Sequence, residues 1–214
     1  MKVMIAVPCF DHMDVMFTHC IVDLITYEHK LNKRECIVVF AASSLIYDAR
    51  NGLATRAINE GYDWILWLDS DMLFEPTLLD DLMKNKKNFV AGLYFNRRTP
   101  YKPAFFKKCY FEQNGLVRKP VAENYYDYPQ NQLFEVEAFG FAAVLTNVEC
   151  IDVIKSSMGL PFCPIAGFGE DLSFCIRARQ IDYKLYVDSR IKVGHLGKLT
   201  VDENLYLAQR SEIK

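Results

Sequence analysis

The chain has 214 residues, of which 51% are hydrophobic and 14% aromatic, enough apolar material for one sizeable core, so we expect one domain. Its formal charge of −2 and isoelectric point near 6.1 give no electrostatic reason to expect a nucleic acid or an anionic membrane as partner. No run of about 18 apolar residues occurs, which predicts that no segment spans a membrane.

The seven cysteines include no C-x-x-C pair, which argues against a zinc cluster. Several of them, such as Cys36 and Cys175, lie within apolar segments, and we expect reduced thiols in a cytoplasmic protein. The apolar stretch at the N-terminus is too short for a signal peptide and is better interpreted as a first strand.

In the first half of the chain, short apolar runs alternate with segments of helical periodicity. The predicted strands cover residues 2–8, 36–40, 63–68 and 89–94. The predicted helices cover residues 14–29, a segment capped by Asp48, and a segment with Pro76 in its first turn. Strands that alternate with helices in this way predict an α/β fold with a parallel sheet covered on both faces.

The second half is less regular. Residues 99–135 are rich in aromatic, proline, asparagine and lysine residues, and we expect loops and short strands there, with a β-ribbon around 103–118. The elements predicted after this segment are a strand or strand pair, two helices and two strands, at 136–146, 147–155, 170–180, 184–187 and 191–194. The tail, 197–214, has no clear pattern and is expected either to cover the active-site rim or to join two subunits.

The strongest signal is an acidic pair that follows the third predicted strand. Asp69-Ser70-Asp71 comes directly after the apolar run from Trp64 to Leu68. In open α/β sheets, ligands bind just beyond the carboxyl ends of strands. Two such carboxylates repel each other unless a cation lies beside them, and a hard divalent cation that also holds phosphates is the usual one. The alternative is a solvated turn, because a D-x-D triplet often occurs by chance.

A second acidic motif, Gly167-Phe168-Gly169-Glu170-Asp171, opens the predicted helix at 170–180. Glycines allow tight turns, and acids in a first helical turn face the positive end of the helix dipole. The motif can therefore be an ordinary helix start. The apolar face of the helix nevertheless directs Asp171 toward the rim that carries the acidic pair.

His195 follows an apolar strand and lies between Gly194 and Gly197. The glycines suggest that the backbone closely approaches another group, and an imidazole suits Mn²⁺ or another transition metal. A purely structural histidine is the alternative.

Two basic positions are less specific. Arg50, near the start of the second helix, is a candidate for contact with a nucleotide or its diphosphate, and a surface arginine is the alternative. Arg97 and Arg98 follow the fourth predicted strand and either meet substrate charge or are solvated.

Taken in chain order, these motifs resemble glycosyltransferases of the GT-A fold, and most closely the compact bacterial and phage members of the glycosyltransferase family 2 type. The resemblance covers roughly residues 2–196. It implies a three-layer α/β/α fold with a mostly parallel central sheet and a small antiparallel part. Within the single domain (1–214), it implies a nucleotide-binding half, an acceptor and catalytic half, and a tail, at 1–95, 96–196 and 197–214.

The resemblance also implies a donor site and a metal site. The implied nucleotide-binding residues are Pro8, Cys9, Arg50, Asp69, Ser70 and Asp71, with Pro8 and Cys9 in the loop after the first strand. The implied ligands of Mn²⁺ or Mg²⁺ are Asp69, Asp71 and His195. Asp69 would also contact the ribose or the donor sugar.

The implied reaction moves a sugar from a nucleotide-sugar, such as a UDP- or GDP-sugar, to a hydroxyl of a glycan or other acceptor. Asp171 matches the general base of inverting members, with Glu170 beside it. A carboxylate in that place removes the proton of the acceptor hydroxyl as it attacks the sugar. The cation stabilises charge on the departing diphosphate.

Two features depart from the family pattern. Residues 40–44 lack the acid that usually reads the base after the second strand, so the donor base stays open, with Asp11 or Asp14 as possible substitutes. The aromatic residues in and just before the middle segment either stack on sugar rings or pack the segment itself; they are Tyr94, Phe95, Tyr101, Phe105, Phe106, Tyr125 and Tyr126.

Three other functions stay open at this point. The first is a retaining transferase, in which Asp171 holds a substrate rather than acting as a base. The second is a sugar nucleotidyltransferase, which the absence of glycine after the first strand disfavours. The third is a non-catalytic sugar- or nucleotide-binding module, which the intact acids disfavour.

Overall fold

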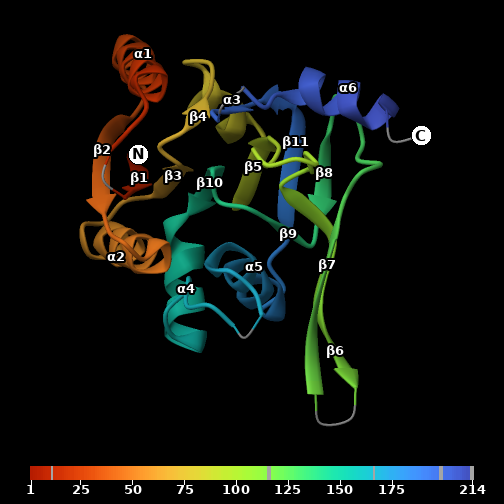
Figure 1. The fold of residues 1–214 in the computed structure, drawn as a ribbon. Coiled ribbons are helices and arrows are strands. Elements are labelled where there is room, and N and C mark those ends of the chain that lie inside the picture. The colour runs from red at the N-terminus through yellow and green to blue at the C-terminus, as the bar shows by residue number, and fades with distance from the viewer. Residues whose placement is uncertain (11, 115–116, 166, 198–199, 213–214) are drawn as a thin grey trace.

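The computed structural model describes residues 1–10, 12–114, 117–165, 167–197 and 200–212. A seven-stranded sheet forms its centre (Figure 1). In sheet order the strands are β2 (Glu35–Ala42), β1 (Lys2–Cys9), β3 (Trp64–Leu68), β10 (Ala143–Asn147), β5 (Phe89–Leu93), β11 (Leu185–Lys192) and β8 (Leu133–Val136). Strands β10 and β8 run antiparallel to their neighbours and the other five share one direction, so the sheet is mostly parallel, as predicted.

Helices cover both faces of this sheet (Figure 1). On one face lie α1 (Val15–Leu31) and α3 (Leu78–Lys84), and on the other lie α2 (Ile46–Asn59), α4 (Val148–Met158) and α5 (Glu170–Gln180). Strand β1 shows the division, because Ile5 belongs to the core with α1 and α3 whereas Met4 belongs to the core with the other three helices. Strands buried on both faces are continuous apolar runs, which is why they could be predicted.

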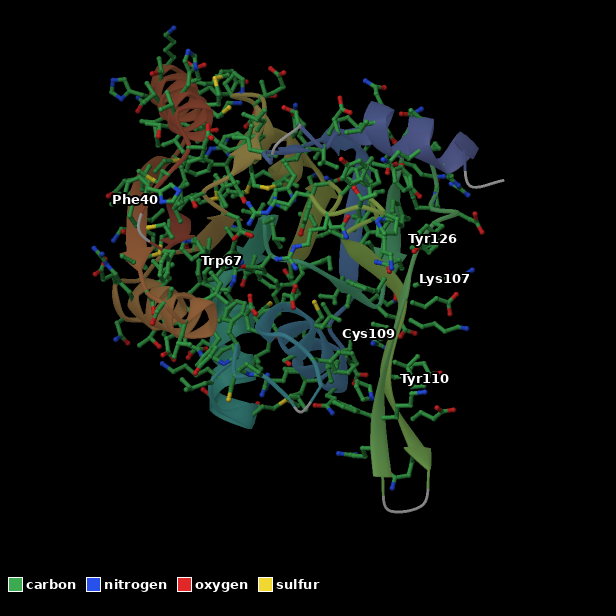
Figure 2. The ribbon with its side chains drawn as sticks, in the orientation of Figure 1. Phe40, Trp67, Lys107, Cys109, Tyr110 and Tyr126 are labelled. Atoms are coloured by element: carbon green, nitrogen blue, oxygen red, sulfur yellow. The ribbon has the colours of Figure 1, made fainter. Side chains whose placement is uncertain are left out.

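Strand β10 links the two halves of the chain. It lies antiparallel between β3 and β5, where Trp67 of β3 is fully buried and donates from its indole nitrogen to the hydroxyl of Thr146 at 2.9 Å (Figure 2). The second half of the chain therefore completes the sheet that the first half begins.

Two small antiparallel sheets complete the fold. One pairs β4 (Met72–Leu73) with β12 (Gly194–His195), and the other joins β7 (Val117–Asn124), β6 (Phe105–Asn114) and β9 (Ala138–Phe139). The β6–β7 ribbon projects away from the sheet (Figure 1). On β6, Cys109 is buried whereas its neighbour Tyr110 is exposed (Figure 2). The predicted ribbon is confirmed and extends to residue 124.

Several predicted boundaries need correction. Asp48 lies in the first turn of α2 rather than at its cap, which is Leu45. Helix α3 begins at Leu78, two residues after Pro76. One strand, β11, replaces the two predicted at 184–187 and 191–194. The strand continues through Asp188 and Ser189, which are buried, and Asp188 accepts a hydrogen bond from Arg190.

The C-terminal tail forms helix α6 (Glu203–Glu212), which packs on the end of the sheet. The ring of Tyr206 stacks on that of Phe95 at 4.2 Å, and Glu203 accepts a hydrogen bond from the Tyr128 hydroxyl at 2.8 Å. Helix α6 thus covers part of the fold, and the two predicted roles of the tail, a cover over the active-site rim or a contact between subunits, stay predictions. All seven cysteines are free thiols, and no helix in the described ranges is long and apolar enough to cross a membrane.

Candidate active site

The acidic pair lies directly after β3, at the carboxyl edge of the sheet. The Asp69 backbone N–H donates to the carbonyl of Ala142 at 3.0 Å, and the Ser70 carbonyl accepts from the Asp14 N–H at 3.4 Å. The loop is therefore held between the start of β10 and the start of α1, so the two carboxylates leave the sheet at fixed positions.

Pro8 and Cys9 are the last two residues of β1, not part of a loop, because the pairing with β2 continues to the end of both strands. Pro8 pairs with Ala41, and the Cys9 thiol lies 3.8 Å from the Ala41 carbonyl oxygen. Their expected loop position is wrong. They nevertheless lie at the same edge as the acidic pair, because β1 and β3 are parallel neighbours, and their contact with a nucleoside stays a prediction.

The β4–β12 pair brings His195 to the acidic pair. His195 lies opposite Met72, and the N–H of Leu196 donates to the carbonyl of Asp71 at 2.7 Å. A Cβ atom on Gly194 would lie 3.3 Å from the Cβ of Leu73, so glycine allows β12 to lie close to β4. The close approach that the sequence predicts at this histidine is therefore an approach to β4.

One oxygen of Asp71 has two partners. Its Oδ2 lies 3.4 Å from His195 Nε2 and forms an ion pair with Arg97 Nη1. Burial raises the pKa of Asp71, but the hydrogen bond and charge of His195 and the charge of Arg97 outweigh burial and hold the pKa below its ordinary value. Burial lowers the pKa of His195, but Asp71 outweighs it and raises the pKa. The two side chains thus stabilise each other in their charged forms.

Asp69 belongs to a second group, which is centred on the buried side chain of Arg50. The guanidinium of Arg50 is 2% exposed and donates to Asp69 Oδ1 at 2.8 Å, to the Phe141 carbonyl at 3.2 Å and to Glu170 Oε1 at 3.4 Å. Burial raises the pKa of Asp69, and Arg50 offsets this only in part. Because its donors are taken by the protein, Arg50 is placed to position two acids, and the predicted contact with a diphosphate is not supported by its burial.

Asp171 lies in the first turn of α5 beside this group. Its Oδ1 accepts from the N–H of Leu172 at 2.7 Å, and Gly140 leaves space near its other oxygen, since a Cβ there would lie 3.6 Å from Oδ2. Burial first, and then the charge of Glu170, raise the pKa of Asp171 to about 6. A carboxylate with a pKa near neutrality is a stronger base than an ordinary aspartate.

The β6–β7 ribbon supports the loop that opens α5. Phe168 packs edge-on against Phe111 of the ribbon, with ring centroids 5.0 Å apart. Gly167 has φ +89°, and a Cβ atom there would lie 2.5 Å from Pro120 Cγ, so glycine is required both by the turn and by the contact. The tight turn predicted for this motif is confirmed.

The other candidates occupy structural positions. Asp14 caps α1 by accepting from the N–H of Met16 at 2.7 Å, and Asp11 lies outside the described residues. Of the middle-segment aromatics, Tyr94, Phe95 and Phe105 are buried, Tyr101, Phe106 and Tyr125 are partly buried against the core, and Tyr126 is 41% exposed. Most of them therefore pack the fold.

Sequence reasoning missed two features of the site and left one undecided. The hydroxyl of Tyr94 accepts from the N–H of Ala142 at 3.2 Å, and a Cβ on Gly140 would lie 3.0 Å from that hydroxyl. Neither residue carries a local signal of its own. Arg97, left open between substrate contact and solvation, pairs with Asp71.

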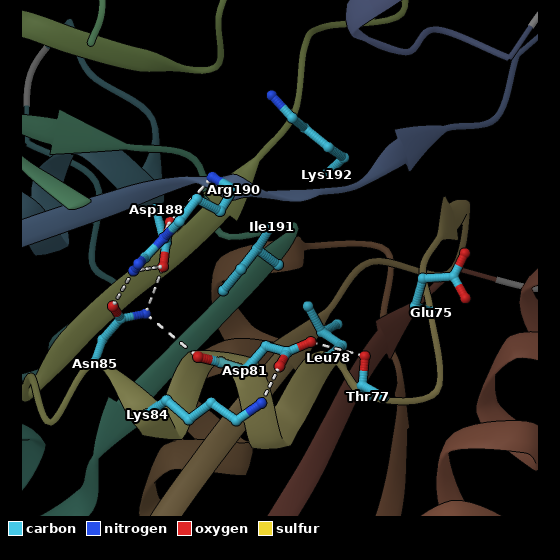
Figure 3. A pocket seen from close by; sticks show the side chains of 10 residues that line it. All are labelled: Glu75, Thr77, Leu78, Asp81, Lys84, Asn85, Asp188, Arg190, Ile191 and Lys192. Atoms are coloured by element: carbon cyan, nitrogen blue, oxygen red, sulfur yellow. Dashed lines mark hydrogen bonds and ion pairs between the residues drawn. The ribbon is translucent and has the colours of Figure 1, made fainter. Parts of the chain in front are cut away.

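A separate hollow lies between α3 and β11, away from the acidic pair (Figure 3). Four of its charged groups bond within it: Asp188 accepts from Arg190 Nη2 at 2.7 Å and from Asn85 Nδ2 at 2.9 Å, and Lys84 pairs with Asp81 at 2.6 Å. These bonds tie α3 to β11.

The comparisons with known proteins agree with this description. Residues 40–139 match the model of Anp1, a glycosyltransferase-like family. The structure is similar to that of A197 from STIV, with a TM-score of 0.62 and 15% identity, over 92% of this chain and 86% of that one. It is also similar to GalNAc-T7 crystallised with UDP, GalNAc and Mn²⁺, with a TM-score of 0.54 and 11% identity.

The GalNAc-T7 likeness covers 92% of this chain but only 44% of that chain, so this protein spans less than half the length of that relative. No curated protein matches the sequence. The structural likenesses confirm the predicted α/β fold of the GT-A type, and the family match over residues 40–139 agrees with it.

Proposed function

We propose that the protein is a metal-dependent, inverting glycosyltransferase that moves a sugar from a nucleoside-diphospho-sugar to an acceptor hydroxyl. One observation carries the proposal, the gathering of these acids. Arg50 bonds both to Asp69 and to Glu170, which lies 120 residues after Arg50 in the sequence, and Asp171 lies beside this group. Asp71, two residues after Asp69, contacts His195. Acids from two distant motifs thus gather at the carboxyl edge of a GT-A-type sheet, where ligands bind in such folds.

The donor chemistry of Asp71 and His195 fits a divalent cation. His195 Nδ1 lies 2.9 Å from the Phe95 carbonyl oxygen, which can only accept, so Nδ1 carries a proton. The lone pair of a neutral ring then lies on Nε2, facing Asp71 Oδ2 at 3.4 Å. Two acceptors at that distance need a proton or a metal ion between them, and an imidazole in the set favours Mn²⁺ over Mg²⁺.

The third predicted metal ligand, Asp69, differs from Asp71 and His195 because one of its oxygens is bonded to the buried Arg50. Among the residues that the structure describes, no three His, Cys, Asp or Glu side chains are grouped so as to hold a metal ion. Because Asp69 Oδ1 is bonded to Arg50, we propose Asp71 and His195 as the protein ligands, with donor oxygens completing the set. When bound, the cation would stabilise the charge that develops on the departing diphosphate.

Asp171 is the proposed general base. Its carboxylate takes the proton of the acceptor hydroxyl while that oxygen bonds to the anomeric carbon, and the bond from this carbon to the donor phosphate oxygen breaks. Attack from the face opposite the diphosphate inverts the anomeric centre. Its raised pKa makes Asp171 a better proton acceptor, and it is still mostly ionised at pH 7.

The proposed partners are a UDP- or GDP-sugar as donor and a glycan or other hydroxyl compound as acceptor. Support for the donor comes from GalNAc-T7, which was crystallised with UDP and Mn²⁺. The seven free thiols support the further proposal of a cytoplasmic location.

A thermal-shift panel of UDP, GDP, CDP and dTDP, each with and without Mn²⁺, tests this function. One nucleotide should stabilise the protein only with Mn²⁺, by about 2.7 kcal/mol at 100 times its dissociation constant. Asp71→Ala should abolish the metal-dependent part, whereas Asp152→Ala, at an exposed position of α4, should not. Equal stabilisation with and without Mn²⁺, or none by any nucleotide, would contradict the proposal.

A further inference from the structure

The two carboxylates of the acidic pair are each neutralised by an arginine, but the two arginines differ in exposure. The side chain of Arg50, on Asp69, is 2% exposed, whereas that of Arg97, on Asp71, is 50% exposed. Arg50 has further protein partners, the Phe141 carbonyl and Glu170, which keep it in place. The Asp69 pair is therefore permanent, and the Asp71 pair can open.

Arg97 and His195 meet at the same oxygen, Asp71 Oδ2. Asp71 and His195 would hold the divalent cation of the proposed function, so its positive charge would act on the same carboxylate that Arg97 pairs with. The guanidinium of Arg97 already occupies the surroundings of that oxygen with a full positive charge. Like charges repel at this distance, so guanidinium and divalent cation exclude each other.

The backbone that carries Arg97 is fixed while its side chain is free to move. The N–H of Asn96 donates to the Lys102 carbonyl, and the Lys102 N–H donates to Asn96 Oδ1, both at 2.9 Å. Phe95, just before this turn, pairs with Pro103 and also supplies the carbonyl that orients His195. The half-exposed side chain can therefore leave Asp71 without a change in the backbone that positions His195.

We propose that Arg97 is a built-in competitor of the divalent cation: its guanidinium neutralises Asp71 while the cation is absent and has to leave Oδ2 when the cation binds. This inference rests on the metal site of the proposed function and adds to it a residue that sets the metal affinity. The protein gains a metal site whose acidic group is never left unpaired, at the cost of weaker binding of the metal alone.

The test is the affinity for Mn²⁺ alone, measured by titration calorimetry on the intact chain without nucleotide. Arg97→Gln should bind Mn²⁺ about fivefold more tightly than the parent, the ratio expected for the loss of one exposed ion pair at the upper end of its range. Arg98→Gln is the matched control, because it removes the same charge from the exposed neighbouring position. Arg97→Lys keeps the charge but loses the planar guanidinium group. Its affinity for Mn²⁺ should lie between that of the parent and that of Arg97→Gln.

Several outcomes overturn the inference. An equal gain in Arg97→Gln and Arg98→Gln would reduce the effect to general charge, and an unchanged or weaker affinity in Arg97→Gln would show that Arg97 does not compete. If parent and variants bind Mn²⁺ equally, the inference fails and the metal site of the proposed function stands. If none of them binds Mn²⁺, the metal site itself fails, and the competition with it.

Discussion

Each of the two sides of the candidate site contains an arginine–aspartate ion pair, but the two arginines differ in burial. On one side, the buried guanidinium of Arg50 pairs with Asp69, whose side chain is 32% exposed, next to Asp171. On the other side, Arg97 and Asp71 form a half-exposed ion pair next to His195. A buried pair that loses one partner leaves an uncompensated charge in the interior, whereas an exposed pair is screened by water and exchanges easily. Burial, rather than residue type, therefore distinguishes the two arginines.

The largest effect that separates the two sides is expected at Asp171. Asp171→Asn should lower the turnover number by about 10³-fold, because an amide cannot accept the proton of the acceptor hydroxyl. The affinity for Mn²⁺ should stay within twofold of the parent value, since the metal ligands lie on the other side. Steady-state kinetics and calorimetry measure the two quantities. Substantial remaining turnover, with retention of the anomeric configuration in the product, would instead support a retaining enzyme.

The second effect concerns stability. Arg50→Ala should lower the free energy of unfolding by about 3 kcal/mol, because Asp69 and Glu170 lose their shared partner. Arg97→Ala should change it by less than about 1 kcal/mol, because its pair is exposed. Urea unfolding in metal-free buffer compares the two. Similar losses in both variants would remove the distinction between a buried and a replaceable pair.

The third effect concerns the metal. His195→Ala should weaken Mn²⁺ binding by about tenfold or more while the thermal midpoint without metal changes little. Calorimetry and a thermal melt provide the two values, and His19→Ala, on the exposed side of α1, is the control. A variant that no longer folds would show that this histidine has a structural role in the contact between β12 and β4.

The smallest effect is a dependence on pH. The pKa of Asp171 is raised to about 6, and the base acts only in its ionised form, so activity should fall as the pH falls through about 6. Between pH 7 and pH 5 the ionised fraction, and with it the rate at saturating substrate and Mn²⁺, should drop about tenfold. A rate profile for the parent measures this. An acidic limb near pH 4 would mean that the raised pKa of Asp171 does not govern the reaction.

Much of the fold could be predicted because a buried strand or helix requires a pattern of apolar residues within its own segment of the sequence. The runs that became β1, β3 and β5 are apolar on both faces, and α5 begins and ends where its motif and periodicity predict, at Glu170 and Gln180. The tight turn at Gly167 could likewise be predicted, because glycine readily adopts a positive φ. These features depend only on neighbouring residues and on the apolar environment that they require.

The tertiary structure alone decided how these parts meet. The insertion of β10 between β3 and β5, the pairing of β12 with β4, and the contact of Arg50 with Glu170 join segments that are far apart in the sequence. Periodicity reports whether a segment is buried, but not which segment lies against it, because pairing depends on the energy of the whole chain. The sequence by itself therefore determined the acids and the histidine of the candidate site. Only the tertiary structure decided that the arginine beside Asp69 is buried and the arginine beside Asp71 is half-exposed.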